Sequence, residues 1–536
     1  MKQRETFFWY DLETFGLDSR SDRVAQFAGI RTDKDLKEID EPVVLYCRLS
    51  DDYLPDPLAC LITYITPDVV AEKGVNESEF FGQINAILSQ PYTCAVGYNS
   101  LRFDDEFIRN GFFRNFIDPY KREYANGNSR WDILDLVRAA HDLRPEGIVW
   151  PIKEETGNPS FKLTDLTQAN AIAHTHAHDA LSDVRATIEV ARLIKRHQPL
   201  LFTYYLTLRS KQKVKSFVNV MGEPVLLTAA PFTRSEGCST LVMPLSGHSK
   251  NPNSVLVFDL RQDPTPLINA AKAFNEVEQL ELMEDDFRKT AQQLKRASES
   301  SLGVEQALRE GTRQLLEGAN LLSNLPRLID GSSQLLQVKG LHRVAINRVP
   351  FFSPLSVIDD EVAKRLNLDV GKCMEHYERL KAVPTVALNL RKALDKEEFL
   401  SIDDVDYSLY SGAFFSDADA QRFAEIRATD PQELWAKRFN FDDPRSYELL
   451  WRYQCRNWPE VLSDAERLRY KSFCALRLIQ PPASDAVTLD FFARKIREKM
   501  ASNSTKAEDK EVLAALEKWG RALCERIGLK YPTPRR

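Results

Sequence analysis

Up to about residue 200, the chain alternates short apolar, β-rich runs with stretches whose apolar residues recur at helical spacing. Phe7–Tyr10 and Thr93–Gly97 are predicted strands, because runs of aromatic and β-branched residues are typical of strands. Strands that alternate with amphipathic helices predict an α/β layer architecture.

The pattern changes after residue 203. Up to residue 261, β-branched runs are broken by Gly and Pro, which predicts a small barrel. The predicted barrel strands are Val225–Thr228, Thr240–Met243 and Val255–Phe258. Between about 266 and 330, apolar residues return at helical spacing and predict two helices packed as a hairpin within the barrel region.

Residues 338–349 return to strand character, and most segments after about residue 355 are predicted to be helices. Ser416–Asp419 has the composition of a helix N-cap, and the last amphipathic stretch runs near Val512–Ile527.

Composition places the chain among ordinary folded proteins, with 43% apolar and 28% charged residues in 536. That length exceeds the ~250 to 300 residues at which single cores stop growing, so two or three domains are expected. The net charge of -6 excludes a uniformly basic coat, and any nucleic-acid site must be local. One region qualifies, because residues 205–261 carry seven basic and three acidic residues.

Eight cysteines are spread along the chain without a CxxC pair, which is typical of reduced, buried thiols. No run of ~18 uncharged apolar residues occurs, and the N-terminus does not resemble a signal peptide. We therefore expect a cytoplasmic protein that does not span a membrane.

Two carboxylates lie two residues apart at the end of the first predicted strand, in Tyr10–Thr14. Side chains at i and i+2 of a strand share a face, so Asp11 and Glu13 repel each other unless a cation lies between them. A metal site is one interpretation, and a solvent-exposed strand end is the other.

A third carboxylate follows the predicted strand that passes Asn99, where a helix begins at Phe103. Phe103 and Phe107, at i and i+4, would anchor this helix to the sheet and leave its first turn near the strand ends. Asp104 is the metal candidate. Asp105 is its rival, although an acid in a first turn is also favoured by the helix dipole.

His178 and Asp183 lie at the start of another predicted helix. Five positions on one helix subtend about 140°, so the two side chains converge only if His178 lies in the preceding loop and Asp183 in the first turns. His174, His176 and His178 alternate, but no three-ligand zinc spacing follows.

These three motifs, in this order, resemble the exonuclease motifs of the DEDDh group, which has a ribonuclease H-like fold. Further stretches resemble the bacterial exonuclease I family: Phe103–Asn110, Asn128–Asp132, Leu143–Gly147, Gly412–Asp419 and Arg456–Pro459. The resemblance covers about 1–265 and 340–480. No counterpart is expected for about 270–330 or for the chain beyond about 485.

The resemblance implies an α/β fold, with a ribonuclease H-like mixed-sheet exonuclease domain, an SH3-like β-barrel domain and an all-helical C-terminal domain. The predicted boundaries are 1–200 for the exonuclease domain, 201–350 for the SH3-like domain with a helical insertion at about 270–330, 351–485 for the helical domain and 486–536 for a helical tail of unassigned role.

The implied activity is Mg²⁺-dependent, processive 3′-5′ digestion of single-stranded DNA to 5′-mononucleotides in DNA repair and recombination. Two Mg²⁺ ions about 3.5 to 4 Å apart are expected, with Mn²⁺ able to substitute. Mg²⁺ prefers carboxylates, which makes Asp11, Glu13, Asp104 and Asp183 its expected ligands. His178, with an ordinary pKa near ~6.5, is the expected general base.

The basic stretch Arg209–Lys215, beside Phe202, Tyr204 and Tyr205, offers cations and aromatic rings for a single strand, or is a solvated basic face. The family match suggests these DNA contacts: Thr14, Arg109, Tyr120, Arg138, Lys162, Tyr204 and Lys211. It also suggests that Arg144 and Tyr204 bind the acidic C-terminal tail of single-stranded DNA-binding protein. The enzyme is expected to be a monomer with nucleoid-associated activity.

Two other hypotheses stay open. The same catalytic class also includes 3′-5′ RNA-trimming exonucleases, and fold alone does not separate them. The appended barrel and helical domain favour DNA, because RNA trimmers of this group typically consist of the catalytic domain alone. A catalytically inactive scaffold is disfavoured because all four acids and the histidine are present.

Overall fold

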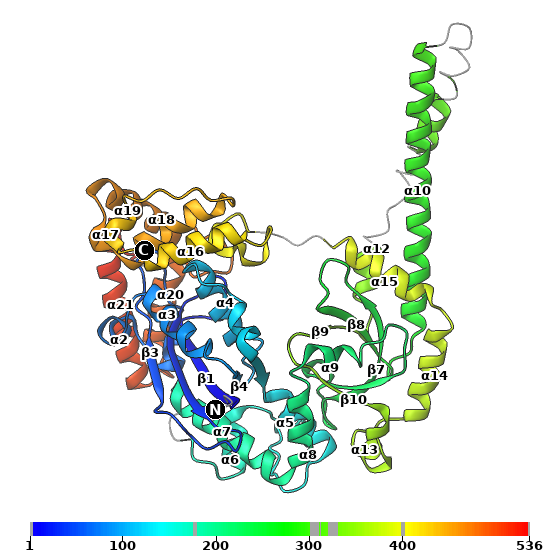
Figure 1. Ribbon diagram of the computed structural model, residues 1–536, viewed down its shortest axis with the longest axis horizontal. Coiled ribbons are helices and arrows are strands. Elements are labelled where there is room, and N and C mark those ends of the chain that lie inside the picture. The colour runs from blue at the N-terminus through cyan, green and yellow to red at the C-terminus, as the bar shows by residue number, and fades with distance from the viewer. Residues whose placement is uncertain are drawn as a thin grey trace.

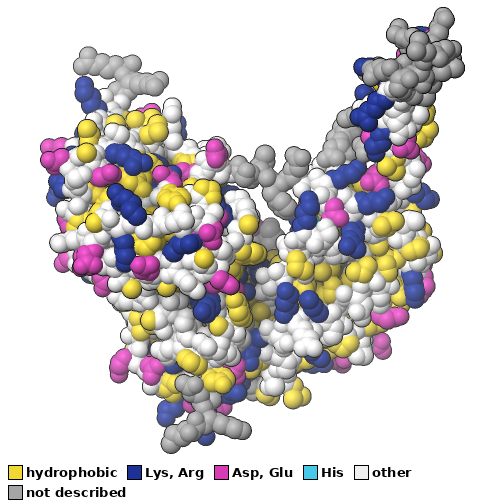
Figure 2. Space-filling view, turned by 45° about the horizontal axis from the view of Figure 1, so that its top comes forward, with side chains coloured by type: hydrophobic (Ala, Val, Ile, Leu, Met, Phe, Trp, Pro, Cys, Tyr) yellow, Lys and Arg dark blue, Asp and Glu magenta, His cyan; other side chains and the backbone are white. Residues whose placement is uncertain are grey.

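The computed structural model describes residues 4–174, 179–300, 310, 312–319, 331–397 and 402–533. Two bodies lie side by side and join near α5 (Leu134–Leu143) and α8 (Pro199–Thr207) (Figure 1). The first body combines the N-terminal sheet with the C-terminal helices. The second is a smaller sheet from which α10 (Thr265–Ser300) projects. A hollow lies between the bodies, with Lys and Arg side chains on both of its sides (Figure 2).

The N-terminal sheet consists of β1 (Thr6–Thr14), β2 (Val24–Thr32), β3 (Val43–Tyr46), β4 (Thr93–Gly97) and β5 (Ser129–Asp132). Its order is β3-β2-β1-β4-β5; β1 pairs antiparallel with β2 and parallel with β4. The mixed sheet and the two strands predicted within β1 and at β4 are confirmed. β1 lies at the centre of the sheet, so its side chains are enclosed from both faces.

Side chains of successive β1 residues point to opposite faces of the sheet, so they belong to two different hydrophobic clusters. Phe7 and Trp9 pack in one cluster with Val184 and Ile188, whereas Phe8 and Tyr10 pack in another with Phe107 and other residues of the opposite layer. The covering helices are α1 (Pro57–Thr63), α2 (Pro67–Lys73), α3 (Glu77–Leu88), α4 (Asp104–Arg114), α5, α6 (Leu163–Ala169) and α7 (Ala180–His197). The period of two therefore directs residues 11 and 13 toward the face that α7 covers.

The second sheet consists of β6 (Val225–Thr228), β7 (Ser239–Gly247), β8 (Ser254–Asp259), β9 (Leu341–Ala345) and β10 (Phe351–Pro354). All its pairs are antiparallel, in the order β10-β6-β7-β8-β9. The three predicted barrel strands are confirmed. The β-rich region begins later than expected, because α8 and α9 (Lys211–Lys215) precede β6.

The predicted insertion begins with α10, a single helix of 36 residues. Residues 312–319 return alongside it, since a Cβ added at Gly318 would lie 3.1 Å from the Phe287 ring. The helices α12 (Gly331–Leu336), α13 (Asp360–Arg365), α14 (Val370–Lys381) and α15 (Thr385–Asp395) follow. The structure thus confirms the packing of two helical arms for the part that it describes; residues 301–309, 311 and 320–330 lie outside that part.

The C-terminal helices are α16 (Asp417–Ala428), α17 (Pro431–Leu434), α18 (Arg445–Asn457), α19 (Asp464–Ile479), α20 (Leu489–Ala501) and α21 (Ala507–Ile527). Short 3₁₀ helices are η1 (Lys121–Glu123), η2 (Ala125–Gly127), η3 (Ala230–Phe232), η4 (Leu355–Val357), η5 (Val405–Tyr410) and η6 (Pro459–Val461). Ser416 caps α16 by accepting a hydrogen bond from the Asp419 N–H at 3.1 Å, as its sequence predicts. None of the helices within the described residues has the length and apolarity that a membrane crossing requires.

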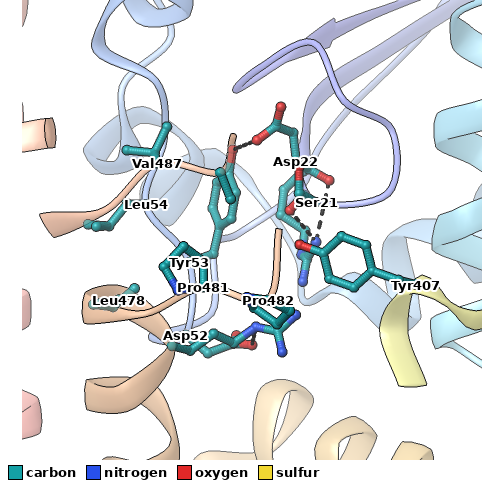
Figure 3. Close-up of a pocket in the computed structure, with 13 residues that line it drawn as sticks. Ser21, Asp22, Asp52, Tyr53, Leu54, Tyr407, Leu478, Pro481, Pro482 and Val487 are labelled. Atoms are coloured by element: carbon teal, nitrogen blue, oxygen red, sulfur yellow. Dashed lines mark hydrogen bonds and ion pairs between the residues drawn. The ribbon is translucent and has the colours of Figure 1, made fainter. Parts of the chain in front are cut away.

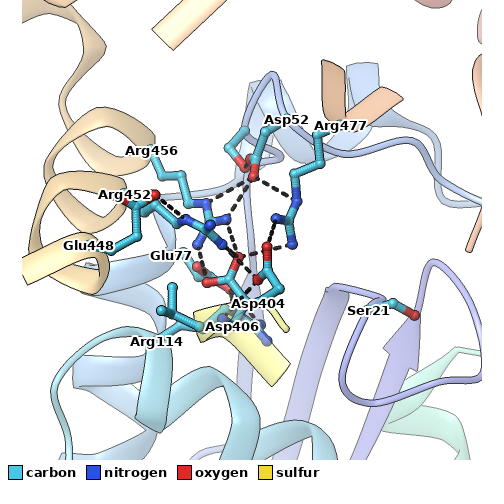
Figure 4. A network of polar contacts seen from close by, with 12 residues as sticks. Ser21, Asp52, Glu77, Arg114, Asp404, Asp406, Glu448, Arg452, Arg456 and Arg477 are labelled. Carbon is cyan, nitrogen blue, oxygen red and sulfur yellow. Dashed lines mark hydrogen bonds and ion pairs between the residues drawn. The ribbon is translucent and has the colours of Figure 1, made fainter. Parts of the chain in front are cut away.

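Buried ion pairs fasten the C-terminal helices to the N-terminal part (Figure 4). Asp52 of the N-terminal part lies 2.7 Å from Arg456 of α18 and 3.6 Å from Arg477 of α19. Both arginines also contact Asp406 of η5, at 2.6 and 2.9 Å. Burial alone would raise the pKa of Asp52, but the arginines outweigh it and hold that pKa well below its usual range. Removing one partner of such a network costs about 3 to 5 kcal/mol, because the remaining charge stays buried without its counter-charge.

A small cavity of about 20 Å³ lies at the same contact (Figure 3). Tyr53 donates there to Asp22 at 3.1 Å and to the Phe15 carbonyl at 3.2 Å. Phe15 follows directly on β1, so these bonds tie the end of the central strand to Tyr53, and both residues pack in one apolar cluster with Leu478 of α19.

Candidate active site

Asp11 and Glu13 lie near the end of β1 and point to the face that α7 covers. Asp183 lies in the first turn of α7, whose N-cap Asp179 accepts a hydrogen bond from the Ser182 N–H at 3.2 Å. Carboxylate oxygens of Asp11, Glu13 and Asp183 all lie within 4.8 Å of one another. The strand and the helix therefore bring together acids that are 170 residues apart in the sequence.

The cluster strongly disfavours its own ionisation. Burial, then Asp104 and Asp183, raise the pKa of Asp11 well above its usual range. Burial, then Asp11 and Asp183, raise the pKa of Glu13 to about 9. Three carboxylates at this spacing are a fitting oxygen donor set for a divalent cation, which would relieve their repulsion.

The structure separates Asp104 from Asp105. Asp104 accepts a hydrogen bond at 3.0 Å from the N–H of Leu12, the residue between Asp11 and Glu13, and burial raises its pKa well above the usual range. Asp104 thus lies against the strand that carries the acid cluster.

Asp105 points into a different environment. It is fully buried, with Arg122 at 2.5 Å, Arg130 at 2.6 Å and the Tyr10 hydroxyl at 2.6 Å. Burial opposes its ionisation, but the arginines outweigh it and hold its pKa well below the usual range. Asp105 is therefore a neutralised structural anion rather than a member of the cluster.

Asp132, at the end of β5, holds the turn that precedes α4. From the sequence, no role was predicted for Asp132. The Asp132 carboxylate accepts from the N–H groups of Asn99 at 2.9 Å, Leu101 at 3.2 Å and Leu134 at 3.0 Å. Asn99 has a left-handed φ of 65°, which Asn tolerates better than most residues. Asp132 thus fixes the segment that leads to Asp104, and only the pairing of β4 with β5 reveals it.

The predicted general base, His178, lies outside the described residues, as does His176. His174 is described, and its Nε2 lies 2.5 Å from Asp183 Oδ1 while its Nδ1 lies 3.1 Å from Thr167 Oγ1. His174 therefore orients the Asp183 carboxylate. The spacing of His174 and Asp183 in the sequence did not indicate that the two side chains are in contact.

The predicted DNA contacts lie in three environments. Lys162 and Lys211 are exposed. Thr14 and Arg109 are buried; Thr14 donates to the Gly16 carbonyl at 2.6 Å, and Arg109 pairs with Glu123 at 2.7 Å. The other three expected contacts, Tyr120, Arg138 and Tyr204, are partly buried. Tyr120 lies beside Arg109 and Arg138 beside Asp135.

The prediction that aromatic rings beside the basic stretch Arg209–Lys215 are available to a single strand is wrong for two residues. Phe202 and Tyr205 are buried and pack on Trp131, with centroids at 5.1 and 5.6 Å. α8 is apolar on its inner face, and that face joins the two bodies rather than meeting a ligand. Arg209 likewise pairs with Glu5 at 2.7 Å, across that junction.

Arg144 and Tyr204 line one pocket of about 670 Å³ between the two bodies. Its other walls are largely apolar and include Leu200, which is 85% exposed. The Tyr204 hydroxyl donates to the Phe352 carbonyl at 2.7 Å. The two residues predicted to bind a partner's tail thus share a cavity that offers a cation and an apolar surface.

The mixed sheet, its acid cluster and the appended sheet and helices define an exonuclease of the ribonuclease H-like class. Family models agree: Exonuclease matches residues 8–191, Exonuclease I SH3-like domain matches 209–301 and 331–396, and Exonuclease I C-terminal domain matches 403–523. Exodeoxyribonuclease I of Haemophilus influenzae is 37% identical over 503 residues, which are 94% of this chain and 96% of the relative. The chain belongs to the exonuclease I family.

Solved structures extend this likeness to three dimensions. The zinc-bound Escherichia coli exonuclease I complex with single-stranded DNA has 35% identity and a TM-score of 0.79, covering 97% of this chain and 100% of that one. A crystal structure of SSB/exonuclease I with the inhibitor CFAM has the same identity, TM-score and coverage.

The family models correct one expectation. The C-terminal model continues to residue 523, and the SH3-like model includes residues up to 301. The prediction that the chain beyond about 485 and the start of the insertion lack a counterpart is therefore wrong. These segments form helices with charged, exposed faces. Such faces carry few distinctive short motifs by which a resemblance could be found.

Proposed function

We propose that this protein is a 3′-5′ exodeoxyribonuclease that degrades single-stranded DNA processively to 5′-mononucleotides, in DNA repair and recombination. The observation that carries the proposal is the cluster of Asp11, Glu13 and Asp183 at the end of the central strand. Relatives named exodeoxyribonuclease I that match nearly the whole chain support it, as does the related complex with single-stranded DNA.

We propose that the cluster, joined by Asp104, holds two Mg²⁺ ions, for which Mn²⁺ substitutes. When bound, the metal supplies positive charge that stabilises the phosphate undergoing hydrolysis. The protein's own contribution is placement: β1 fixes Asp11 and Glu13, α7 fixes Asp183, and the Leu12 N–H holds Asp104. His174 keeps the Asp183 carboxylate in one orientation.

His178 is proposed as the general base that removes a proton from the attacking water, on its motif position alone. His178→Ala is expected to lose about 10² to 10⁴ in single-turnover rate while retaining DNA binding, because positioned proton transfer usually contributes that much. A pH profile that keeps its histidine limb in the variant would contradict this role.

The remaining predicted contacts stay proposals. Lys162 and Lys211 are proposed to bind phosphates, for which their exposure leaves the ammonium groups accessible. The pocket of Arg144 and Tyr204 suits a tail that ends in a carboxylate next to an apolar side chain, such as the acidic tail of single-stranded DNA-binding protein. A monomeric state and a cytoplasmic location remain predictions.

The direction of digestion tests the proposal. In Mg²⁺, a strand labelled at its 3′ end is expected to release its label first as a mononucleotide, whereas a 5′-labelled strand is expected to release its label last. Asp11→Ala and Asp183→Ala are expected to abolish both while retaining the unfolding temperature and DNA binding. Early release of the 5′ label would refute the direction, and near-normal turnover by either variant would refute the site.

A further inference from the structure

A buried glutamine, Gln26, lies on β2 beside the acid cluster. It is 2% exposed, and its backbone is paired with that of Glu13 on β1. Directly opposed residues of an antiparallel pair point to the same face, with their Cβ atoms about 4.5 to 5.5 Å apart. Gln26 therefore lies on the face of the sheet that carries Asp11 and Glu13 and that α7 covers.

Both ends of the Gln26 amide have a hydrogen-bond partner. Its Oε1 accepts from the Ala180 N–H at 3.2 Å, and its Nε2 donates to the Tyr46 hydroxyl at 2.8 Å. A backbone N–H can only donate, so the amide oxygen must face Ala180 and the amide nitrogen must face Tyr46. Tyr46 is also the backbone partner of Gln26 on β3. Two different elements therefore fix the orientation of this amide.

Ala180 is the first residue of α7. The first N–H groups of a helix have no partner within the helix. In α7, the N–H groups of Ser182 and Asp183 are bound by the side chain and the carbonyl of Asp179, at 3.2 and 3.0 Å. The Ala180 N–H is instead bound from the sheet, so Gln26 ties the beginning of α7 to β2.

This polar contact supplies a direction that the apolar part of the interface lacks. On its inner face, α7 buries Val184, Ile188 and Ala191 in the main hydrophobic cluster, and burial of apolar surface is non-directional. Such packing holds the helix on the sheet but defines its position along its own axis less well. A hydrogen bond requires a donor–acceptor distance of about 2.7 to 3.2 Å and near-linear geometry, so it sets that position.

The position of α7 decides where Asp183 lies. Asp183 follows Ala180 by three residues, which is about 4.5 Å along the helix axis. Its carboxylate lies within 4.8 Å of the carboxylates of Asp11 and Glu13, both of which are on β1. Gln26 thus connects the strand next to Glu13 with the helix that carries Asp183.

We propose that Gln26 is a positioning residue, which holds α7 where the carboxylates of Asp11, Glu13 and Asp183 can share a divalent cation. The proposal rests on the function proposed above and adds a residue that acts through Asp183. Outer partners of metal ligands typically contribute about 10- to 100-fold in metal affinity or activity. A glutamine suits this place because it is neutral and adds no charge to carboxylates that already repel one another.

Metal binding without DNA tests the role of Gln26. Gln26→Met keeps a similar side-chain length and removes both hydrogen bonds. In isothermal titration calorimetry with Mn²⁺, this variant is expected to bind about 10- to 100-fold more weakly than the wild type, with Asp11→Ala as the blank. Equal Mn²⁺ affinity of Gln26→Met and the wild type would overturn the proposal.

Thr32→Val is the matched control for a general loss of stability. Thr32 lies on the same strand, is fully buried and accepts a hydrogen bond from Trp9 Nε1 at 2.9 Å. It is six residues from Gln26, or about 20 Å along the strand. Thr32→Val is expected to bind Mn²⁺ like the wild type, even if its unfolding temperature falls. A similar loss of Mn²⁺ affinity in this control would refute a specific role, because any weakening of β2 would then have the same effect.

Turnover separates positioning from DNA binding. At a Mg²⁺ concentration that half-saturates the wild type, Gln26→Met is expected to react about 5- to 50-fold more slowly in a single turnover, because metal occupancy falls in that proportion. Its affinity for an oligodeoxynucleotide in EDTA should equal that of the wild type. Weaker DNA binding with an unchanged rate would contradict the proposal.

A milder variant serves if Gln26→Met does not fold. Tyr46→Phe removes only the hydroxyl that orients the Gln26 amide, at a partly buried position. It is expected to lose Mn²⁺ affinity in the same direction but to a smaller extent than Gln26→Met. In that case an unchanged affinity of Tyr46→Phe would overturn the proposal.

The positioning role and the proposed function can fail separately. If the wild type degrades no DNA, the function proposed above fails, and weaker Mn²⁺ binding by Gln26→Met still supports the positioning role. If the wild type degrades DNA and both proteins bind Mn²⁺ equally, the positioning role alone is overturned.

Discussion

Asp104 and Asp105 are neighbours in one helical turn, and the structure predicts opposite outcomes when each is changed to asparagine. Asp105 is the anion beside Arg122, whose side chain is fully buried. Two other nitrogens of Arg122 have no hydrogen-bond partner among the described atoms. Asp105→Asn would keep the shape but leave this buried guanidinium without its closest counter-charge.

The cost of that loss follows from the burial of both partners. Breaking a buried pair typically costs about 3 to 5 kcal/mol, and each kcal/mol lowers the unfolding temperature of a unit of this size by about 2 to 4 °C. Asp105→Asn is therefore expected to unfold about 6 to 20 °C lower. Glu123, 3.0 Å from Arg130, still compensates the charge of that arginine in the variant. The fall in unfolding temperature is therefore expected near the smaller of these values.

Asp104→Asn is expected to retain its stability and to lose its activity. The asparagine oxygen can still accept from the Leu12 N–H, and removal of a negative charge relieves the repulsion that raises the pKa of Asp11. The unfolding temperature should stay equal or rise. Activity should fall by more than the ~10- to 100-fold that loss of an outer partner of a metal site typically costs.

Differential scanning fluorimetry and mononucleotide release, both at pH 7, measure the two effects. Asp104→Glu and Asp105→Glu serve as matched controls that retain the charge. An inactive but stable Asp105→Asn, together with an active Asp104→Asn, would refute the assignment and move the functional acid one position along the helix.

Three further predictions follow from the charges. In metal-free protein, folding raises the pKa of Glu13 to about 9, so the native state binds more protons and stability should fall as pH rises from about 4.5 to 9. Saturating Mg²⁺ should remove this slope, because Glu13 is then ionised in both the native and the unfolded state, and an unchanged slope in Glu13→Gln would count against the pKa. Arg144→Ala should digest naked DNA normally yet lose stimulation by single-stranded DNA-binding protein; equal stimulation would exclude the pocket. Lys211→Glu should weaken binding and reduce the log-log salt slope by about 0.7 or more per lost phosphate contact; an unchanged slope would indicate a solvated face.

The sequence predicts the elements that its local pattern controls. The aromatic run that begins at Phe7, the strand ending at Gly97 and the helix that begins at Asp104 all appear where expected. The i, i+4 pair Phe103 and Phe107 also meets, with centroids 4.9 Å apart. Each of these depends on neighbours within a few positions.

Contacts between segments that are distant in the sequence could not be predicted from the sequence. The choice between Asp104 and Asp105 depends on Arg122 and Arg130, which are brought in by a loop and by β5. An aromatic residue near a basic stretch looks the same in sequence whether it is exposed or buried, which is why Phe202 was misassigned. Its burial depends on the strand that carries Trp131.

The most direct test of the proposed function compares substrates. Initial rates of mononucleotide release are measured in Mg²⁺ from DNA and RNA single strands of equal length and sequence, with Asp11→Ala as the blank. The wild type is expected to release mononucleotides rapidly from DNA and slowly or not at all from RNA, and the variant is expected to release none from either. Faster release from RNA would contradict a deoxyribonuclease, and DNA release that persists in Asp11→Ala would contradict the acid cluster as its site.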